Sequence, residues 1–453
     1  MAYIGSTPTS QNFISGTDYF NGTGSQTAFT LTRTVNSVND IEAVVNNVVQ
    51  RPNDAYTLSG TTITFTSAPS SGTNNIYIRY LSTTLQSITV PANSITRNQL
   101  DSNLQSVAIG KNKIINGAMV IDQRNAGASV TANDAVFVVD RFRYSASQTG
   151  KATSQQSSTA PIGFTNSVLY TSSSAYSVTS TDYFLLSQRI EGYNIADLNW
   201  GTANAKTVTL SFWVQSSLTG TFGGAIQNNG SSRSYPFSYT IGAANTWTQI
   251  SVVIPGDTSG TWLTTNGLGM IVWFGLGCGA TYSGTAGAWA SANYGSSTGA
   301  TSVVGTNGAT FYITGVQLEV GSSATGFEYE NYTSLLQKCQ RYFEMSFPQG
   351  TAPANGVSNY YKFIAAGLNG STAYTNCGVF CVEKRSSPTM TFYRTDNGSS
   401  NGQPAYFSGG TWNNGSSISP ASSTRAFQYN YGGSFSANSA YFTDVSWTAS
   451  SEL

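Results

Sequence analysis

Apolar and polar residues alternate with a period of two over most of the chain, which is typical of β-strands that bury one face. Residues 208–214 (VTLSFWV) and residues 270–276 (MIVWFGL) each carry four alternate apolar positions. The intervening positions include Trp213 and Trp273, which the alternation places on the outer faces. Several such runs, separated by Gly- and Asn-rich turns, predict an antiparallel β-sandwich in the middle of the chain.

Shorter alternating runs flank this region. Near the N-terminus, Ile63 shares its parity with Phe65, and Ile76 shares its parity with Ile78, with Pro, Asn, Asp and Gly between the runs. Five alternating runs follow residue 345, and residues 385–388 (RSSP) predict a hairpin turn between the second and the third of them. Each of these two regions is expected to form a small β domain.

The period changes in residues 86–112, where Thr96 and Gln99 have the spacing of a helix capping box. Leu100, Leu104 and Val107 fall on one face of such a helix, and together with Ile95 they are the candidate contact residues of a stalk. A helix this short is not stable alone, since isolated helices below about 12 residues are marginal in water. The segment is therefore either a stalk in which three copies of the chain meet or a linker helix lying on its own domain.

A parity change marks the end of the predicted sandwich. Phe311 and Ile313 share one parity, whereas Val316 and Leu318 share the other, and the change falls at Gly315. A one-residue shift would turn the following apolar side chains into solvent unless a β-bulge absorbs it, and glycine permits a bulge. We therefore predict a bulge at Gly315.

An amphipathic helix is predicted directly after the sandwich. Ser334 and Gln337 have the spacing of a capping box. The residues with helical apolar spacing are Leu335, Leu336, Cys339, Tyr342 and Phe343. Because Cys339 lies inside this stripe, packing is its expected role.

These patterns predict a mainly β chain with five segments. They are an N-terminal β module (1–85), a linker or stalk with a short helix (86–112), an antiparallel jelly-roll sandwich (113–330), a connecting helix (331–345) and a C-terminal β domain (346–453).

Composition narrows the possible functions. Only 9% of the 453 residues are charged and the formal net charge is zero, so the chain lacks the basic field that nucleic-acid binding requires. The chain has no histidine, which removes Ser-His-Asp and Cys-His relays and the commonest zinc ligand sets. We expect the four cysteines, Cys278, Cys339, Cys377 and Cys381, to be buried free thiols.

Paired carboxylates are the remaining candidates for catalysis, since a glycosidase needs two of them about 5 to 9.5 Å apart. The candidate groups are Glu319 with Glu328 and Glu330, and Asp182 with Glu191. For the first group we favour charges near a helix N-terminus, which the helix macrodipole stabilises. Asp140 with Arg141 and Arg189 with Glu191 are expected to be structural ion pairs. We therefore predict no enzyme activity.

We also expect no cofactor and no metal site. Asp182 and Asp257 could contribute to a structural calcium site, but no acidic calcium-binding loop accompanies them.

Aromatic residues among polar loops are the candidates for ligand binding, because a ring can stack on a sugar while amides and hydroxyls bond its hydroxyl groups. The candidates for glycan contact are Tyr406, Phe407, Trp412, Tyr429 and Tyr431 in the C-terminal region, with Trp213 and Trp289 in the sandwich. Trp273 is a further possible member of a sugar platform.

Several parts of the chain resemble bacteriophage fibres, among them the two described next. The order FTL, DAYTLSGTTITFTSAP and IYIRYLSTT within the first 85 residues resembles the N-terminal attachment module of tail fibres from short-tailed phages. The ordered segments KNKIINGAMVIDQRNAG, VVDRFRY, LLSQRIEGYN, VTLSFWVQ, TWTQISVVIPGDTSGTW and FYITGVQLEVGSSATGFEY resemble the jelly-roll domain of phage receptor-binding proteins, which is itself similar to carbohydrate-binding modules.

The resemblance implies a trimeric tail fibre that docks on tail or adaptor proteins through residues 1–85. Its partner would be a host surface polysaccharide or an outer-membrane component. The first residues lack the basic and apolar parts of a signal peptide, so we expect synthesis in the host cytoplasm and a place in the virion tail. Two alternatives stay open: a tailspike enzyme that cleaves polysaccharide with paired carboxylates, and a scaffold fibre whose receptor-contacting tip is another protein.

Overall fold

The computed structural model describes residues 16–81, 110–357, 362–369, 372–375, 377–394, 405–408, 411–414, 418–432 and 440–453. The chain is mainly β, as predicted. It divides into two compact units, Met1–Ile95 and Thr96–Leu453, and each is described separately below. None of the helices in the described ranges is long and apolar enough to cross a membrane. The predicted stalk residues Ile95, Leu100, Leu104 and Val107 lie outside the described residues.

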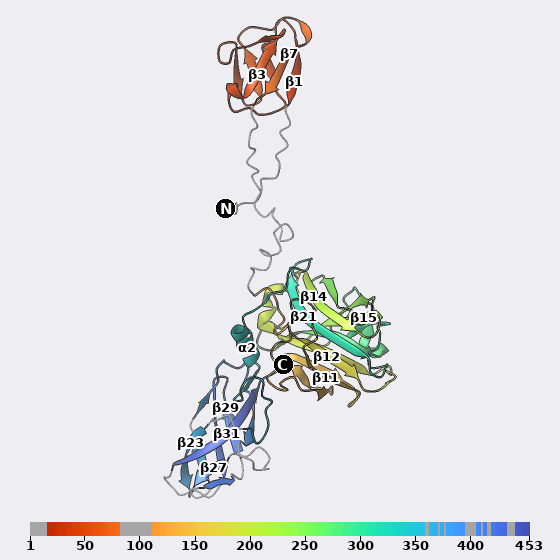
Figure 1. Cartoon of the computed structure of the whole chain (residues 1–453), viewed down its shortest axis with the longest axis vertical. Coiled ribbons are helices and arrows are strands. Elements are labelled where there is room, and N and C mark those ends of the chain that lie inside the picture. The colour runs from red at the N-terminus through yellow and green to blue at the C-terminus, as the bar shows by residue number, and fades with distance from the viewer. Residues whose placement is uncertain are drawn as a thin grey trace. The chain divides into compact units, whose positions relative to one another are not determined.

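The first unit contains two small antiparallel sheets (Figure 1). One sheet has the order β1 (Thr17–Gly22), β7 (Gly72–Tyr80), β3 (Ile41–Val45), β4 (Val48–Val49), and the other has the order β2 (Ala28–Thr30), β6 (Thr62–Phe65), β5 (Tyr56–Ser59). A 3₁₀ turn, η1 (Val38–Asp40), precedes β3. The predicted alternation is confirmed, because Ile63, Phe65, Ile76 and Ile78 all lie in the core.

The second unit begins with an antiparallel sandwich of two six-stranded sheets. The first sheet has the order β17 (Thr248–Ile254), β14 (Val208–Ser216), β21 (Thr310–Val320), β12 (Ser167–Ser172), β11 (Ala152–Ser157), β8 (Val130–Thr131); β14, β21, β12 and β11 can be followed in Figure 1. The second sheet has the order β16 (Ser234–Ile241), β15 (Gly220–Asn228), β18 (Leu268–Cys278), β13 (Tyr183–Glu191), β10 (Phe142–Ala146), β9 (Phe137–Val139).

The core of the sandwich lies between these sheets and is rich in aromatic rings. Phe212 on β14 meets Phe274 on β18 edge to face, with ring centroids 5.1 Å apart. Both side chains are fully buried, as the period-two alternation predicted. Three 3₁₀ turns and one parallel pair of short strands complete the sandwich: η3 (Gly192–Asn194), η4 (Ala196–Leu198), η5 (Ala280–Tyr282), β19 (Ser283–Gly284) and β20 (Ser296–Ser297).

The predicted bulge at Gly315 is confirmed. The register of β14 against β21 shifts between Ser211, which faces Gln317, and Trp213, which faces Thr314. Gly315 has a φ of +62°, a backbone conformation that side chains with a Cβ rarely adopt. Val316 and Leu318 therefore return to the core and are fully buried.

The connecting helix differs from its prediction at both ends. Helix α2 (Tyr332–Gln340) begins after Asn331, whose side chain accepts a hydrogen bond from the Thr333 amide, so the predicted cap at Ser334 is wrong. Asparagine caps a helix as well as serine does, and it stands three residues earlier. Tyr342 and Phe343 follow the helix and are buried, and Phe343 begins strand β22 (Phe343–Met345).

The C-terminal strands form one large sheet around β31 (Ala440–Ser450). Its other members are β23 (Lys362–Asn369), β24 (Thr372–Thr375), β25 (Gly378–Val379), β26 (Thr389–Arg394), β27 (Ala405–Ser408), β28 (Thr411–Asn414), β29 (Ile418–Ser422) and β30 (Ala426–Gly432), with β22 also paired to β31. The predicted hairpin at residues 385–388 is wrong, because β25 pairs with β30 while β26 pairs with β31. Strands far apart in sequence compete with local hairpins for the same backbone groups, and here the distant pairings prevail.

The charged residues predicted to pair within the sandwich have other partners than expected. Asp140 pairs with Arg124 at 2.6 Å, whereas Arg141 pairs with Glu452. Glu191 accepts both Nε and Nη2 of Arg341. Asp140 and Arg141 lie in the turn between β9 and β10, where Arg141 has a φ of +71°, and the register of β13 shifts between Ile190 and Glu191. In both predicted pairs this irregular backbone directs the charges toward partners that are distant in sequence.

Candidate functional site

A cavity of about 380 Å³ opens on the outer face of the second sandwich sheet. Outward-pointing residues of four strands line it: Arg143 and Ser145 on β10; Tyr183, Leu185 and Arg189 on β13; Ile271 and Trp273 on β18; Gln227 on β15. The strand register places these side chains on one face of the sheet, because Arg143 is opposite Ser187 and Ser187 is opposite Trp273. The rim comes from loops and turns that contribute Asp134, Asn229, Ser231, Tyr282, Asn293 and Gly295.

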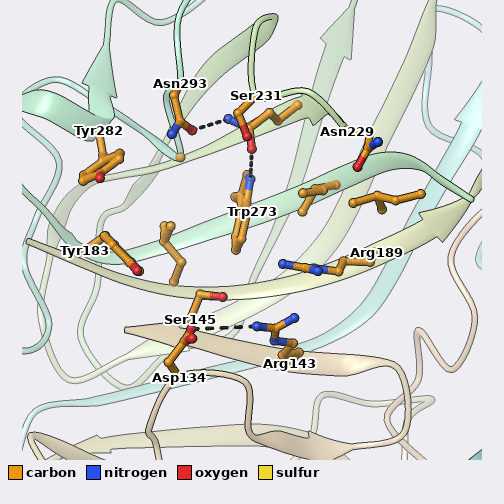
Figure 2. Close-up of a pocket in the computed structure, with 15 residues that line it drawn as sticks. Asp134, Arg143, Ser145, Tyr183, Arg189, Asn229, Ser231, Trp273, Tyr282 and Asn293 are labelled. Carbon is orange, nitrogen blue, oxygen red and sulfur yellow. Dashed lines mark hydrogen bonds and ion pairs between the residues drawn. The ribbon is translucent and has the colours of Figure 1, made fainter. Parts of the chain in front are cut away.

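Trp273 lies at the centre of the cavity wall and is held by a chain of hydrogen bonds (Figure 2). Its indole Nε1 donates to Gln227 Oε1 at 3.1 Å, and Gln227 Nε2 donates to Asn293 Oδ1 at 2.6 Å. Trp273 is 7% exposed and packs against Leu185 and Ile271. The polar edge of the ring is therefore satisfied within the protein, and the ring is fixed in one orientation.

Two tyrosine rings flank Trp273 on one side, as Figure 2 shows. Tyr183 and Tyr282 meet edge to face with centroids 5.1 Å apart. Both are partly exposed, and burial raises the pKa of Tyr183 above its ordinary value. Amide and hydroxyl groups of Asn229, Ser231 and Asn293 stand on the rim. The cavity thus combines apolar ring surface with neutral polar groups.

Glycines let a loop lie flat on the same sheet beside the cavity. A Cβ at Gly275 would come within 2.5 Å of Ser296 Oγ, and a Cβ at Gly223 would come equally close to the same atom. Without side chains at these positions, the segment that carries Asn293 and Gly295 packs directly on the strands. The cavity is therefore built by tertiary contact between this loop and the sheet.

Asp182 fixes the loop that leads into Tyr183. Its Oδ2 accepts hydrogen bonds from Tyr176 Oη at 2.9 Å and from Thr179 N and Oγ1 at 2.9 and 2.7 Å, while its Oδ1 accepts one from Ser147 Oγ at 2.8 Å. Burial by itself would raise the pKa of Asp182, but hydrogen bonds from Thr179, Ser147 and Tyr176 outweigh it and hold that pKa well below its usual range.

We expect Asp182→Asn to lower the free energy of unfolding by about 2 kcal/mol at pH 7. The side-chain amide nitrogen would replace one carboxylate oxygen and would face hydrogen-bond donors, which it cannot accept from. Since the depressed pKa of Asp182 adds stability above the unfolded pKa of about 4, that stability is lost as the pH falls below it. The difference between the two proteins should therefore shrink between pH 5 and pH 3 in urea titrations. Asp197→Asn, a change at a half-exposed partner of Lys113, is the control and should cost under about 1 kcal/mol. A pH-independent difference would contradict the assignment.

The candidate carboxylates near the end of the sandwich accept hydrogen bonds from other protein groups or form ion pairs with them. Glu319 accepts hydrogen bonds from Thr325 N at 2.8 Å and from Thr325 Oγ1 at 2.6 Å. Glu328 accepts a hydrogen bond from the backbone amide of Asn112 at 2.7 Å. Glu330 pairs with Lys338 at 2.6 Å. None of the three lies in the first turn of α2: Glu330 directly precedes the capping residue Asn331, whereas Glu319 lies on β21.

The remaining acidic candidates are also held by protein groups. Glu191 accepts Tyr342 Oη at 2.6 Å in addition to Arg341. Asp257, the second suggested calcium ligand, accepts Arg233 Nε and Nη2 at 2.8 and 2.7 Å. Within the described part of the chain, no group of three or more cysteine or acidic side chains is arranged to hold a metal ion.

The aromatic residues predicted for ligand contact fall in several places. Tyr429 is 1% exposed and its hydroxyl pairs with Thr443 Oγ1 at 2.9 Å, so it belongs to the core of the C-terminal sheet instead of a binding surface. Phe407 is 40% exposed on β27. Tyr406, Trp412 and Tyr431 lie on β27, β28 and β30, but their side chains are outside the described part of the structure.

The two predicted sandwich tryptophans do not line the cavity. Trp289 packs edge to face against Trp200 and Trp262, and its Nε1 donates to Pro255 O at 2.8 Å. Trp213 lies on the other sheet beside Gly315. Of the tryptophans considered for a sugar platform, only Trp273 is in the cavity.

Most of the residues that line the cavity are not among the predicted site residues. Tyr183, Tyr282 and Arg143 were not candidates, and Arg189 was expected to pair with Glu191. The alternation within residues 142–146, 183–191 and 268–278 indicates which side chains face outward. It does not indicate that these three strands are neighbours in one sheet.

Two of the four cysteines also differ from their prediction. Cys339 is buried and Cys278 is partly buried, but Cys377 and Cys381 are exposed. All four are free thiols. Burial raises the pKa of the Cys339 thiol well above its usual value, which makes Cys339 unreactive.

No family model and no curated protein matches the chain. Among solved structures, it is similar to the enzymatically active domain of tailspike protein 4 from bacteriophage CBA120, at 13% identity over 47% of this chain and with a TM-score of 0.26. This chain spans only 22% of the length of that protein.

Two further solved structures are described as carbohydrate-binding modules. The family 11 module of a cellulosomal cellulase from Clostridium thermocellum is 13% identical over 44% of this chain and 98% of its own, with a TM-score of 0.22. A structure described as CBM4 is 14% identical over 46% of this chain and 98% of its own, with a TM-score of 0.24. These low scores identify no family, and the function has to be inferred from the chain's own residues.

Proposed function

We propose that this chain is a phage tail-fibre or receptor-binding subunit that recognises a host surface glycan in the cavity beside Trp273. The observation that carries the proposal is the combination of Trp273, Tyr183 and Tyr282 with the amides of Asn229 and Asn293 in one preformed cavity. Such a cavity suits a sugar, whose ring has an apolar face and whose edge is polar. The proposed site lies in the sandwich and contains none of the candidate residues of the C-terminal region.

The proposed role is binding without catalysis. Among the residues that line the cavity, Asp134 is the one carboxylate, whereas glycoside hydrolysis uses two. The ordered segments that resemble phage fibres support a homotrimer in the virion tail that docks through residues 1–85. Three sites on one fibre would turn weak single contacts into firm attachment by high effective concentration.

The test measures binding of the full chain to an immobilised panel of bacterial surface oligosaccharides. We expect Tyr282→Ala to weaken binding about tenfold, which corresponds to about 1.4 kcal/mol, because one ring contact is removed. Tyr193→Ala removes a 60% exposed ring outside the cavity and should leave binding unchanged. Light scattering on the same samples should give the mass of a trimer.

Several results would contradict this function. Equal weakening by the two tyrosine variants would place the glycan elsewhere on the chain. Release of reducing ends from the panel would favour the tailspike enzyme. Absence of binding to every glycan, with a well-folded protein, would favour a scaffold fibre.

A further inference from the structure

Two arginines lie close together on the side of the cavity away from the tyrosines (Figure 2). Arg143 on β10 is opposite Ser187 on β13, so Arg189 is its diagonal neighbour on the same face of the sheet. Burial, together with the charge of Arg143, lowers the pKa of Arg189 to about 10. The two guanidinium groups are therefore close enough to repel each other electrostatically.

The charge of Arg143 is only partly compensated. Asp134 stands 3.9 Å from Arg143 and its side chain is 53% exposed, so the pair is loose and screened by water. Glu452 is the other carboxylate whose charge acts on Arg189, and it forms ion pairs with Arg124 and Arg141. Among the cavity-lining residues, two arginines and one aspartate give a net charge of +1.

Both arginines also have unused hydrogen-bonding capacity. The Nε atoms of Arg143 and Arg189 are buried and have no hydrogen-bond partner among the described residues. Arg189 uses Nη1 to donate to Leu453 O at 3.0 Å. Buried donors without partners cost free energy, and a guanidinium fork matches the two oxygens of a carboxylate.

We propose that the glycan recognised in this cavity is acidic, and that Arg143 and Arg189 bind the carboxylate of a uronic acid. The proposal rests on the glycan-binding function given above. The carboxylate carbon of a uronate is bonded directly to a ring carbon, so the sugar ring can contact Trp273 while the carboxylate reaches the arginines. Its single negative charge balances the +1 of the lining, whereas a phosphate monoester carries about −1.5 to −2 at neutral pH.

The probe is a set of oligosaccharide pairs of equal length and linkage, glucose with glucuronate, galactose with galacturonate and mannose with mannuronate, titrated against the full chain. At least one uronate should bind about tenfold more tightly than its neutral counterpart. Arg143→Gln should remove most of that advantage, measured as the ratio of the uronate affinity to the neutral affinity of the same variant. Arg143→Lys keeps the charge and should lose less than Arg143→Gln.

Arg51→Gln is the matched control, because it removes one positive charge at an 83% exposed side chain in the other unit. It should change no affinity. Arg189→Gln gives a second test, and near-ultraviolet circular dichroism checks that each variant is folded. Should Arg189→Gln fail to fold because it loses its contact with Leu453, the Arg143 series still decides the question.

The outcomes separate this inference from the function on which it rests. Equal binding of neutral and acidic members, weakened in both by Tyr282→Ala, would overturn the inference and leave the glycan-binding function standing. Uronate binding that survives both arginine changes, or tighter binding of a hexose phosphate than of every uronate, would also overturn the inference. Binding of no member of the panel would overturn both.

Discussion

Replacing Glu344 by alanine should lower the free energy of unfolding of the C-terminal sheet by about 3–5 kcal/mol, the largest change predicted for this protein. Glu344 on β22 pairs with Lys384, and the two side chains are 2% and 0% exposed. Glu344 Oε1 also accepts the Cys381 amide at 2.9 Å. The substitution would leave a buried ammonium without its counter-charge and an amide without its acceptor.

Urea unfolding and hydrogen exchange in β22 and β31 would measure this effect. Glu383→Ala is the matched control, because its partner is the 78% exposed Arg425 and its loss should cost far less. Replacing Glu344 and Lys384 together by methionine should restore most of the stability, since no unpaired charge remains. Equal effects of Glu344→Ala and Glu383→Ala would show that the buried pair does not support the sheet.

Replacing Gly315 by valine should cost about 3 kcal/mol, the second large effect. The φ of +62° disfavours any residue with a Cβ by about 1–2 kcal/mol. A Cβ there would also lie 2.7 Å from Phe164 Cζ and 3.0 Å from Trp213 Cδ1. Overpacking of this kind typically adds about 1–3 kcal/mol.

Gly299→Val separates these two contributions. Gly299 has a φ of +77°, but no atom lies within 4 Å of the position that a Cβ would take there, so only the backbone cost of about 1–2 kcal/mol should appear. Both variants can be compared by thermal and urea unfolding of the sandwich. If they cost the same, the contact with Phe164 relaxes freely and the bulge is less tightly packed than we infer.

Local patterns predicted the strands well and their partners poorly. Val316 and Leu318 could be assigned to the core from parity alone. A one-residue change of parity at a glycine is accommodated by a bulge, which turns the apolar side chains after it back toward the core. The predicted hairpin at residues 385–388 is absent: β25 pairs with β30 and β26 pairs with β31, both distant in sequence. Which distant strand lies beside a given strand cannot be read from local alternation. Helix α2 was recognised from its apolar spacing, whereas its cap at Asn331 was decided by one side-chain hydrogen bond.

The sequence by itself determined the class of the molecule and the face on which each strand residue lies, because parity depends only on the backbone of one strand. Only the tertiary structure decided that Arg143, Arg189 and Trp273 share a cavity, since strand order brings β10, β13 and β18 side by side. The same contacts gave the acidic residues structural partners such as Arg341 and Thr325. The free energy that selects those partners comes from burying the whole sheet, which no local segment of the sequence contains.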